Sequence, residues 1–185
     1  MQNYEEVLSE ILIDSETLQA RVKELGAQIS MDYPDGDLLL ICILRGGVPF
    51  MVDLSRSITS PHKMDFMAVS SYGAGARQST GSARVTLDLQ MDIRGQQVLL
   101  VEDIIDSGHT IASVLNMLQT RNPKSLKVCA LLDKPERREA DVPIHYLGFS
   151  IPNKFVFGYG LDLDEYHRNL PFVGVVDLDK YKPSV

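Results

Sequence analysis

The sequence contains no tryptophan and only two cysteines in 185 residues. Two cysteines are too few for the disulfide framework of a small secreted domain. Cys42 and Cys129 both lie in apolar runs, so we expect buried free thiols in a reducing cytoplasm. The four histidines show no metal-ligand spacing. No apolar run approaches the ~18 residues that cross a bilayer, and the acidic start of the chain lacks a signal-peptide pattern. These absences predict a cytoplasmic protein with no membrane partner.

Basic residues are also scarce relative to acidic ones. The chain has 18 lysines and arginines against 25 aspartates and glutamates, which gives a formal net charge of −7. Nucleic-acid-binding domains usually carry a basic surface, so we expect no nucleic-acid partner. The sequence has no evident linker, internal repeat or low-complexity tract, and its length suits one folding unit. We therefore expect residues 1–185 to form a single domain.

The strongest functional signal is the stretch 97–110, QVLLVEDIIDSGHT. Val98–Val101 are four apolar residues typical of a buried parallel strand, and Glu102 and Asp103 follow where we expect that strand to end. A small polar loop, 106–110, then leads into a run with helical spacing. Backbone N–H groups at a helix start bind phosphate, whereas carboxylates repel it and bind sugar hydroxyls or a divalent cation. The stretch therefore predicts a site for a 5-phosphorylated ribose whose hydroxyls face the acid pair.

Apolar runs typical of strands alternate with runs of helical spacing along the chain. The expected strands are 7–13, 38–44, 64–69, 85–89, 98–101, 126–132, 146–151, 155–159 and 172–176, and the expected helices are 14–30, 48–58 and 107–120. Residues 73–83 are small and polar, which predicts a mobile loop before a returning hairpin arm. The alternation predicts an α/β fold with a central, mainly parallel twisted sheet flanked by helices.

The run VEDIIDSG followed by Thr resembles the phosphoribosyl-diphosphate motif of the type I phosphoribosyltransferases, and its form is similar to that of the hypoxanthine-guanine phosphoribosyltransferases. The resemblance extends from about Val7 to Val176. It implies the type I phosphoribosyltransferase fold, with a small hood region and a flexible lid loop. It also implies a purine salvage transferase that makes IMP or GMP and diphosphate from hypoxanthine or guanine and 5-phosphoribosyl 1-diphosphate. Mg²⁺ is the implied cofactor, and a homodimer or homotetramer is the implied assembly.

The resemblance also implies roles for individual residues. Asp106 is implied as the catalytic group that manages the proton at purine N7, although an aspartate before a helix is also a common N-cap. The implied metal-binding residues are Glu102, Asp103 and Asp162, and the implied diphosphate-binding residues are Arg45, Gly46 and Arg168. The implied 5-phosphate-binding residues are Asp106, Ser107, Gly108, His109 (through its backbone N–H) and Thr110. The implied purine-binding residues are Lys134, Phe155, Val156 and Asp162, and the implied lid residues are Ser71 and Tyr72.

Several of these residues also have an ordinary structural interpretation. A lone lysine beyond a strand end, such as Lys134, is most often solvated, whereas the resemblance implies that it donates to the purine 6-oxo group and makes adenine a poor substrate. Asp162 and Arg168 by themselves would be surface charges. The family often has a cis peptide before the basic residue that matches Arg45. Gly160 stands where alanine is common in the family, a change for which we expect no consequence.

The alternative function is a non-catalytic, nucleotide-sensing, RNA-binding regulator of the same fold. Such relatives usually lack an acid at the position of Asp106, and RNA binding needs a basic face, so the sequence favours an enzyme. Residues 99–103 alone also resemble the first strand of response-regulator receiver domains. Too little chain follows for that five-stranded fold, however, and the phosphate loop would remain unexplained.

Overall fold

The computed structural model describes residues 3–71 and 83–183. Within them, six strands form one sheet in the order β4-β3-β2-β5-β6-β7. Their bounds are β2 (Leu38–Leu44), β3 (His62–Ser71), β4 (Ala83–Leu87), β5 (Gln97–Ile105), β6 (Ser125–Asp133) and β7 (Tyr146–Ser150). Neighbouring strands are parallel except β4, which runs antiparallel to β3. The predicted mainly parallel α/β sheet is confirmed.

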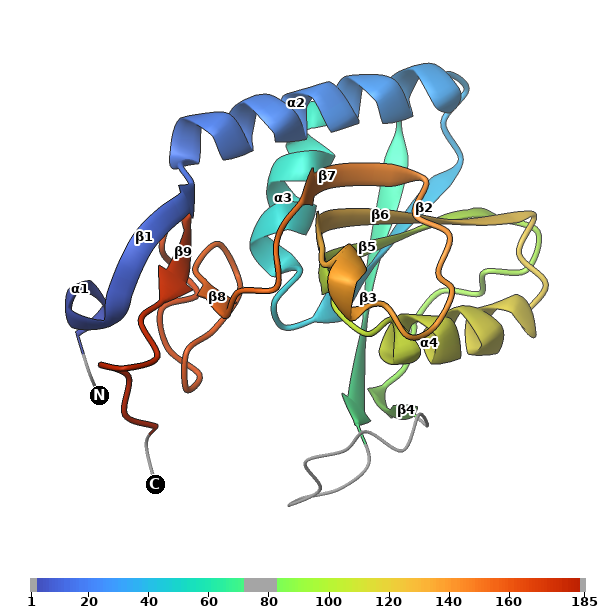
Figure 1. Ribbon diagram of the computed structural model, residues 1–185. Coiled ribbons are helices and arrows are strands. Elements are labelled where there is room, and N and C mark those ends of the chain that lie inside the picture. Colours follow the sequence, from blue (N-terminus) through green and yellow to red (C-terminus); the bar gives the residue numbers. More distant parts are fainter. Residues whose placement is uncertain (1–2, 72–82, 184–185) are drawn as a thin grey trace.

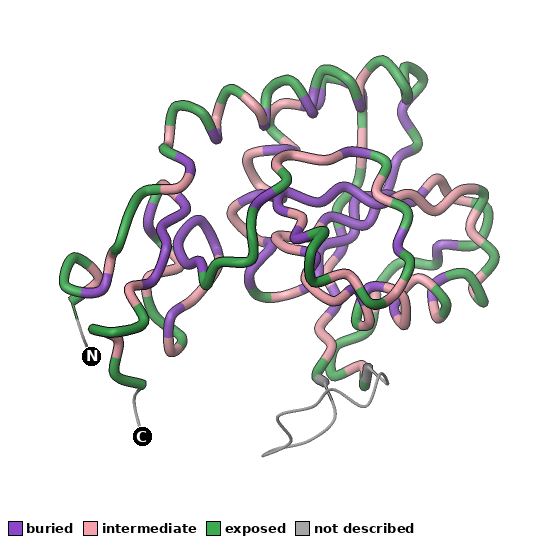
Figure 2. The backbone as a smooth tube through the Cα atoms, viewed as in Figure 1, coloured by how far each residue is buried: buried purple, intermediate pink, exposed green. Residues whose placement is uncertain are grey.

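Helices cover both faces of this sheet (Figure 1). Helices α2 (Ser15–Asp32) and α3 (Val48–Ser57) pack on one face, and α4 (His109–Gln119) packs on the other. Alternate residues of β2 belong to the two apolar clusters, with Leu40 facing α2 and α3 and Ile41 facing α4. This two-sided burial explains why the central strands are continuous apolar runs rather than alternating ones, and Figure 2 shows the buried residues concentrated there.

A smaller sheet joins the two ends of the chain. Its order is β1-β9-β8, all antiparallel, with β1 (Leu8–Ile13), β8 (Val156–Phe157) and β9 (Val173–Val176). The short helix α1 (Tyr4–Val7) precedes β1. Val7 and Phe157 are fully buried in an apolar cluster that also contains Leu163. This sheet corresponds to the hood region that the resemblance implied.

Strand β5 is longer than expected. The sequence predicts its end at Val101, but the strand continues to Ile105, so the acid pair lies inside it. The reason is that β6 keeps pairing with β5 up to Ile105, whereas pairing with β2 stops at Cys42 and Val101. Only the side of β5 that faces β2 is therefore open at the level of the acid pair.

The other differences are shifted element ends and two short elements that were not expected. Strand β3 is longer than expected and β8 is shorter, and neither α1 nor the 3₁₀ turn η1 (Pro135–Arg137) was expected. Helix α4 begins at His109 rather than residue 107, because Gly108 with φ +88° occupies the N-cap, and no side chain caps this end. None of the described helices has the length and apolar content needed to cross a membrane.

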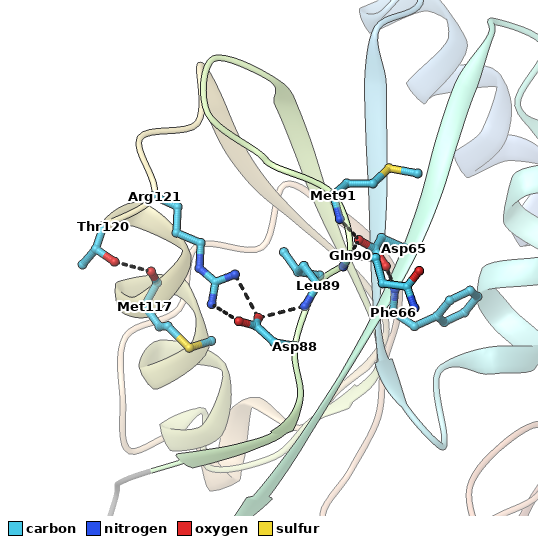
Figure 3. Close-up of polar contacts among 9 residues, drawn as sticks. All are labelled: Asp65, Phe66, Asp88, Leu89, Gln90, Met91, Met117, Thr120 and Arg121. Carbon is cyan, nitrogen blue, oxygen red and sulfur yellow. Dashed lines mark hydrogen bonds and ion pairs between the residues drawn. The ribbon is translucent and has the colours of Figure 1, made fainter.

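The segment after β4 is held at two points, shown in Figure 3. The buried carboxylate of Asp65 accepts hydrogen bonds from the backbone N–H groups of Gln90 and Met91, both at 2.9 Å. Asp88 forms an ion pair with Arg121, just beyond the end of α4, at 2.9 Å. These contacts hold the segment that follows β4, and Thr86 of β4 borders the cavity described next.

Candidate active site

A cavity of about 790 Å³ opens at the carboxyl ends of β2, β3 and β5, where ligands bind in open α/β sheets. The structure brings six predicted site residues to its wall, from three separate parts of the chain: Arg45, Gly46, Glu102, Asp103, Asp162 and Arg168. Thr86 of β4 and Glu165 also line it. The predicted metal-binding and diphosphate-binding residues therefore share one cavity.

Glycines allow the walls of this cavity to approach one another. A Cβ atom on Gly46 would lie 1.6 Å from Oδ2 of Asp103, so only glycine leaves this carboxylate in place. Gly160 has φ +102°, and a Cβ atom there would lie 1.9 Å from the Gly46 carbonyl oxygen. Gly160 thus has a structural role that the resemblance did not indicate. The peptide between Leu44 and Arg45 is cis.

The acid pair is buried in a way that disfavours its negative charge. Oε2 of Glu102 is buried and has no hydrogen-bond partner among the residues that the structure describes, while Oδ1 of Asp103 accepts from the adjacent Ile104 N–H at 2.7 Å. Desolvation raises the pKa of Asp103 to about 6. Desolvation, and then the neighbouring charge of Asp103, raise the pKa of Glu102 well above its usual range. Such a pair is stabilised by a cation.

These carboxylates fit a Mg²⁺ ion that is partly coordinated by substrate. The unpartnered Glu102 oxygen is a hard ligand of the kind that Mg²⁺ prefers. Among the described residues, no group of three or more histidine, cysteine or carboxylate side chains is placed to hold a metal. Mg²⁺ is commonly bound through one or two carboxylates together with substrate phosphates and water, so two protein ligands suffice.

A second cavity, of about 150 Å³, adjoins the first at Glu102. Its walls contain the predicted phosphate loop and the start of α4: Asp106, Ser107, Gly108 and Thr110. Backbone N–H groups at residues 139 and 140 donate to the Ser107 carbonyl at 2.9 and 3.0 Å and hold the loop in place. His109 is not among the residues that line this cavity, and its side chain pairs with Glu139 at 2.9 Å. The role of its backbone N–H remains a prediction.

Asp106 lies between two basic side chains. Lys134 is only 6% exposed, so the solvated interpretation is wrong. Its Nζ lies 3.6 Å from Oδ2 of Asp106, and Nε of Arg137 donates to Oδ1 at 2.7 Å. The N-cap of α4 is Gly108, and no side chain caps this end, so Asp106 is not the cap. The sequence analysis did not identify Arg137 as a site residue. Its position three residues after Lys134, which was predicted to lie in the site, could have suggested it.

Comparisons with known proteins agree with this geometry. Residues 10–164 match the model of the phosphoribosyl transferase domain. The chain is 50% identical to the hypoxanthine phosphoribosyltransferase of Salmonella typhimurium, over 91% of this chain and 96% of that protein. It is 48% identical to the hypoxanthine-guanine phosphoribosyltransferase of Mycobacterium tuberculosis, over 95% and 89%. The chain belongs to the hypoxanthine-guanine phosphoribosyltransferase family.

Solved structures support the same assignment. A hypoxanthine phosphoribosyltransferase from Staphylococcus aureus superposes with a TM-score of 0.93 at 42% identity, covering 97% of both chains. The hypoxanthine phosphoribosyltransferase of Trypanosoma cruzi gives a TM-score of 0.89 at 38% identity, covering 97% of this chain and 96% of that chain. The implied type I phosphoribosyltransferase fold is confirmed.

Some predicted site residues lie outside both cavities of this phosphoribosyltransferase. Phe155 is 45% exposed, and its ring centroid lies 6.2 Å from that of Tyr181 in the C-terminal segment. Val156 is buried at the start of β8, as a core residue would be. Ser71 is the last residue of β3, and Tyr72 and most of the predicted lid lie outside the described residues. The roles of these residues remain predictions.

Glu165 is the main residue of the large cavity that sequence reasoning missed. Its carboxylate lies 2.6 Å from Nη2 of Arg45 and 3.2 Å from Nη2 of Arg168. Arg168 also pairs with Asp162 at 2.8 Å and donates to the Gly160 carbonyl at 2.9 Å. Both predicted diphosphate-binding arginines therefore share one carboxylate partner.

Proposed function

We propose that this phosphoribosyltransferase makes IMP or GMP and diphosphate from hypoxanthine or guanine and 5-phosphoribosyl 1-diphosphate. The observation that carries the proposal is the buried acid pair, Glu102 and Asp103, between a phosphate loop and a loop bearing Arg45. Phosphoribosyl diphosphate has the same order of groups: a 5-phosphate, ring hydroxyls and a diphosphate. The names of the curated relatives support a 6-oxopurine as the second substrate.

The proposed contacts follow the two cavities. The loop 106–110 and the start of α4 bind the 5-phosphate through backbone N–H groups. Glu102 and Asp103 accept hydrogen bonds from the ribose hydroxyls, and with Asp162 nearby they hold Mg²⁺, which would neutralise the diphosphate as it leaves. Arg45 and Arg168 supply further positive charge to that group.

Asp106 has the proposed catalytic role. As the bond from C1 to the diphosphate loosens, C1 develops oxocarbenium-like charge, as in glycosyl transfer generally, and purine N9 attacks it. As N9 bonds to C1, the Asp106 carboxylate accepts the proton that leaves N7. Lys134 and Arg137 fix the orientation of that carboxylate, one on each oxygen. We propose that Lys134 also donates to the purine 6-oxo group, with Phe155 and Val156 binding the base.

A substrate panel tests the proposal. Nucleotide formation is measured from phosphoribosyl diphosphate with hypoxanthine, guanine, xanthine, adenine or uracil, with Mg²⁺ and with excess EDTA. Turnover with hypoxanthine and guanine, little with adenine or uracil, and loss of activity in EDTA are expected. Turnover with uracil, or with none of the five bases, would contradict the proposal.

The family resemblance also leads us to propose a cytoplasmic homodimer or homotetramer. Light scattering coupled to size-exclusion chromatography measures the assembly, and a monomer at micromolar concentration would contradict it. No finding favours the RNA-binding regulator that the sequence left as an alternative.

A further inference from the structure

Glu165 places a negative charge where the proposed diphosphate site needs none. Its carboxylate contacts both arginines that line the cavity, Arg45 at 2.6 Å and Arg168 at 3.2 Å. The Arg45 and Glu165 side chains are 67% and 60% exposed, so this pair contributes little to folding stability. A stabilising role in the fold therefore does not account for the contact.

The backbone presents Glu165 toward the arginines at some conformational cost. Glu165 has φ +70°, and its neighbour Asp164 has φ +52°. Non-glycine residues in this region are strained, and such strain gathers at ligand clamps and switch segments. The turn is held by a hydrogen bond from the Glu165 N–H to Asp162 Oδ2 at 2.9 Å and by paired backbone bonds between Leu163 and Tyr166. The position of Glu165 is thus fixed rather than incidental.

We propose that Glu165 is an internal competitor for the diphosphate group. Its carboxylate occupies the two arginines while the site is empty, and diphosphate must displace it to bind. The inference rests on the proposed function and adds to it a residue that sets diphosphate affinity. The physical reason is that guanidinium groups bind carboxylate and phosphate oxygens with the same fork of donors, so the two anions exclude each other.

The competition has a consequence for turnover. Diphosphate is both the leaving part of the proposed substrate and a product that must depart. A carboxylate tethered beside Arg45 and Arg168 replaces diphosphate contacts as that product leaves, because the arginines are never without an anionic partner. Removal of the Glu165 charge should therefore strengthen binding of both phosphoribosyl diphosphate and free diphosphate.

Titration calorimetry with inorganic diphosphate and Mg²⁺, without any purine, tests the proposal directly. Glu165→Gln removes the charge and keeps the shape, and Glu165→Ala removes both. We expect each variant to bind diphosphate roughly three- to tenfold more tightly than wild type, the size expected from losing exposed ion pairs. The KM for phosphoribosyl diphosphate and the inhibition constant of diphosphate should fall by the same factor.

Glu24→Gln is the matched control. Glu24 is an exposed glutamate of α2 that pairs with Arg21, also at 2.6 Å, outside both cavities. It should leave diphosphate affinity unchanged. If wild type binds diphosphate and neither Glu165 variant binds it more tightly, the inference is overturned while the proposed function stands. Weaker binding would show that Glu165 orients the arginines instead, which also overturns it. If wild type does not bind diphosphate, the proposed function itself fails.

Discussion

At the residue scale, the proposed site holds side chains in states that reduce folding stability. Glu102 has a buried oxygen that no described residue contacts through a hydrogen bond, and burial raises the pKa of Asp103 to about 6. A cation and a substrate with hydroxyl donors would relieve both. Because burial of these carboxylates destabilises the fold, we infer that their role is to bind a ligand and not to stabilise the protein.

Asp103→Asn should make the metal-free protein more stable above pH 6. The pKa of this carboxyl is 3.8 in the reference state and about 6 in the folded protein, so only the folded state holds the proton between those values. Ionisation of Asp103 therefore lowers the free energy of unfolding by about 3 kcal/mol. This loss is complete above about pH 6 and absent below about pH 4. Urea unfolding in EDTA at pH 5, 6, 7 and 8 measures the difference between variant and wild type. Equal stability at pH 8 would contradict the prediction.

Asp106→Asn should lower kcat far more than it weakens binding of phosphoribosyl diphosphate. Asparagine keeps the shape but cannot take a proton, and loss of general acid–base catalysis costs about 10²- to 10⁴-fold. Steady-state kinetics and calorimetry separate the two effects. Glu24→Gln, which removes a carboxylate paired with Arg21 outside both cavities, is the control. An unchanged kcat would remove Asp106 from the proton-transfer role.

At the element scale, the site depends on three segments that meet at the end of β2. The loop at Gly46 lies against Asp103 of β5, and Gly160 lies against the Gly46 backbone. A methyl group at Gly46 would meet the Asp103 side chain, which can rotate away. A methyl group at Gly160 would meet a backbone carbonyl, which cannot move without shifting the chain. The two glycines should therefore respond differently to an added methyl group.

Gly46→Ala should impair activity with little loss of stability. The new Cβ would push the Asp103 carboxylate aside, and a displacement of about 1 Å in a reacting site costs about 10²-fold in kcat/KM. Gly160→Ala should instead lower the free energy of unfolding by about 1–3 kcal/mol, because its φ of +102° is strained for alanine and its Cβ meets backbone. Denaturant unfolding and kinetics on both variants check this. If the two variants changed kcat/KM by similar factors and the free energy of unfolding by similar amounts, the prediction would be wrong.

At the scale of the whole molecule, the two ends of the chain jointly build the hood sheet and lie near each other (Figure 1). Val7 from the N-terminal end packs in one apolar cluster with Phe157 and Leu163. Leu163 belongs to the same turn as Asp162 and Glu165. Val7 thus supports a turn of the proposed diphosphate site.

Val7→Ala should reduce stability by about 1–3 kcal/mol and also raise the KM for phosphoribosyl diphosphate. The cavity left in the hood cluster would loosen the turn that carries Asp162. Val22→Ala removes the same methyl groups from a fully buried site on α2. It should cost similar stability without changing KM. An equal effect of the two variants on KM would show that the hood does not support the site.

The sequence by itself determined the fold class and the family, and it indicated the loop 106–110 that we propose binds phosphate. Buried parallel strands are continuous apolar runs, and a loop of small polar residues before a helix is a local pattern, so both can be read in order along the chain. It did not determine the strand ends, since β5 extends past Val101 only because β6 pairs with it there. Pairing with a distant strand leaves no local signal.

Only the tertiary structure decided which charges share a partner. Lys134 is an ordinary lysine beyond a strand in the sequence, yet folding buries it beside Asp106. Arg45 and Glu165 are separated by most of the chain and meet at 2.6 Å. The physical reason is that ion pairing and desolvation depend on distance and burial, which long-range packing sets and sequence spacing does not.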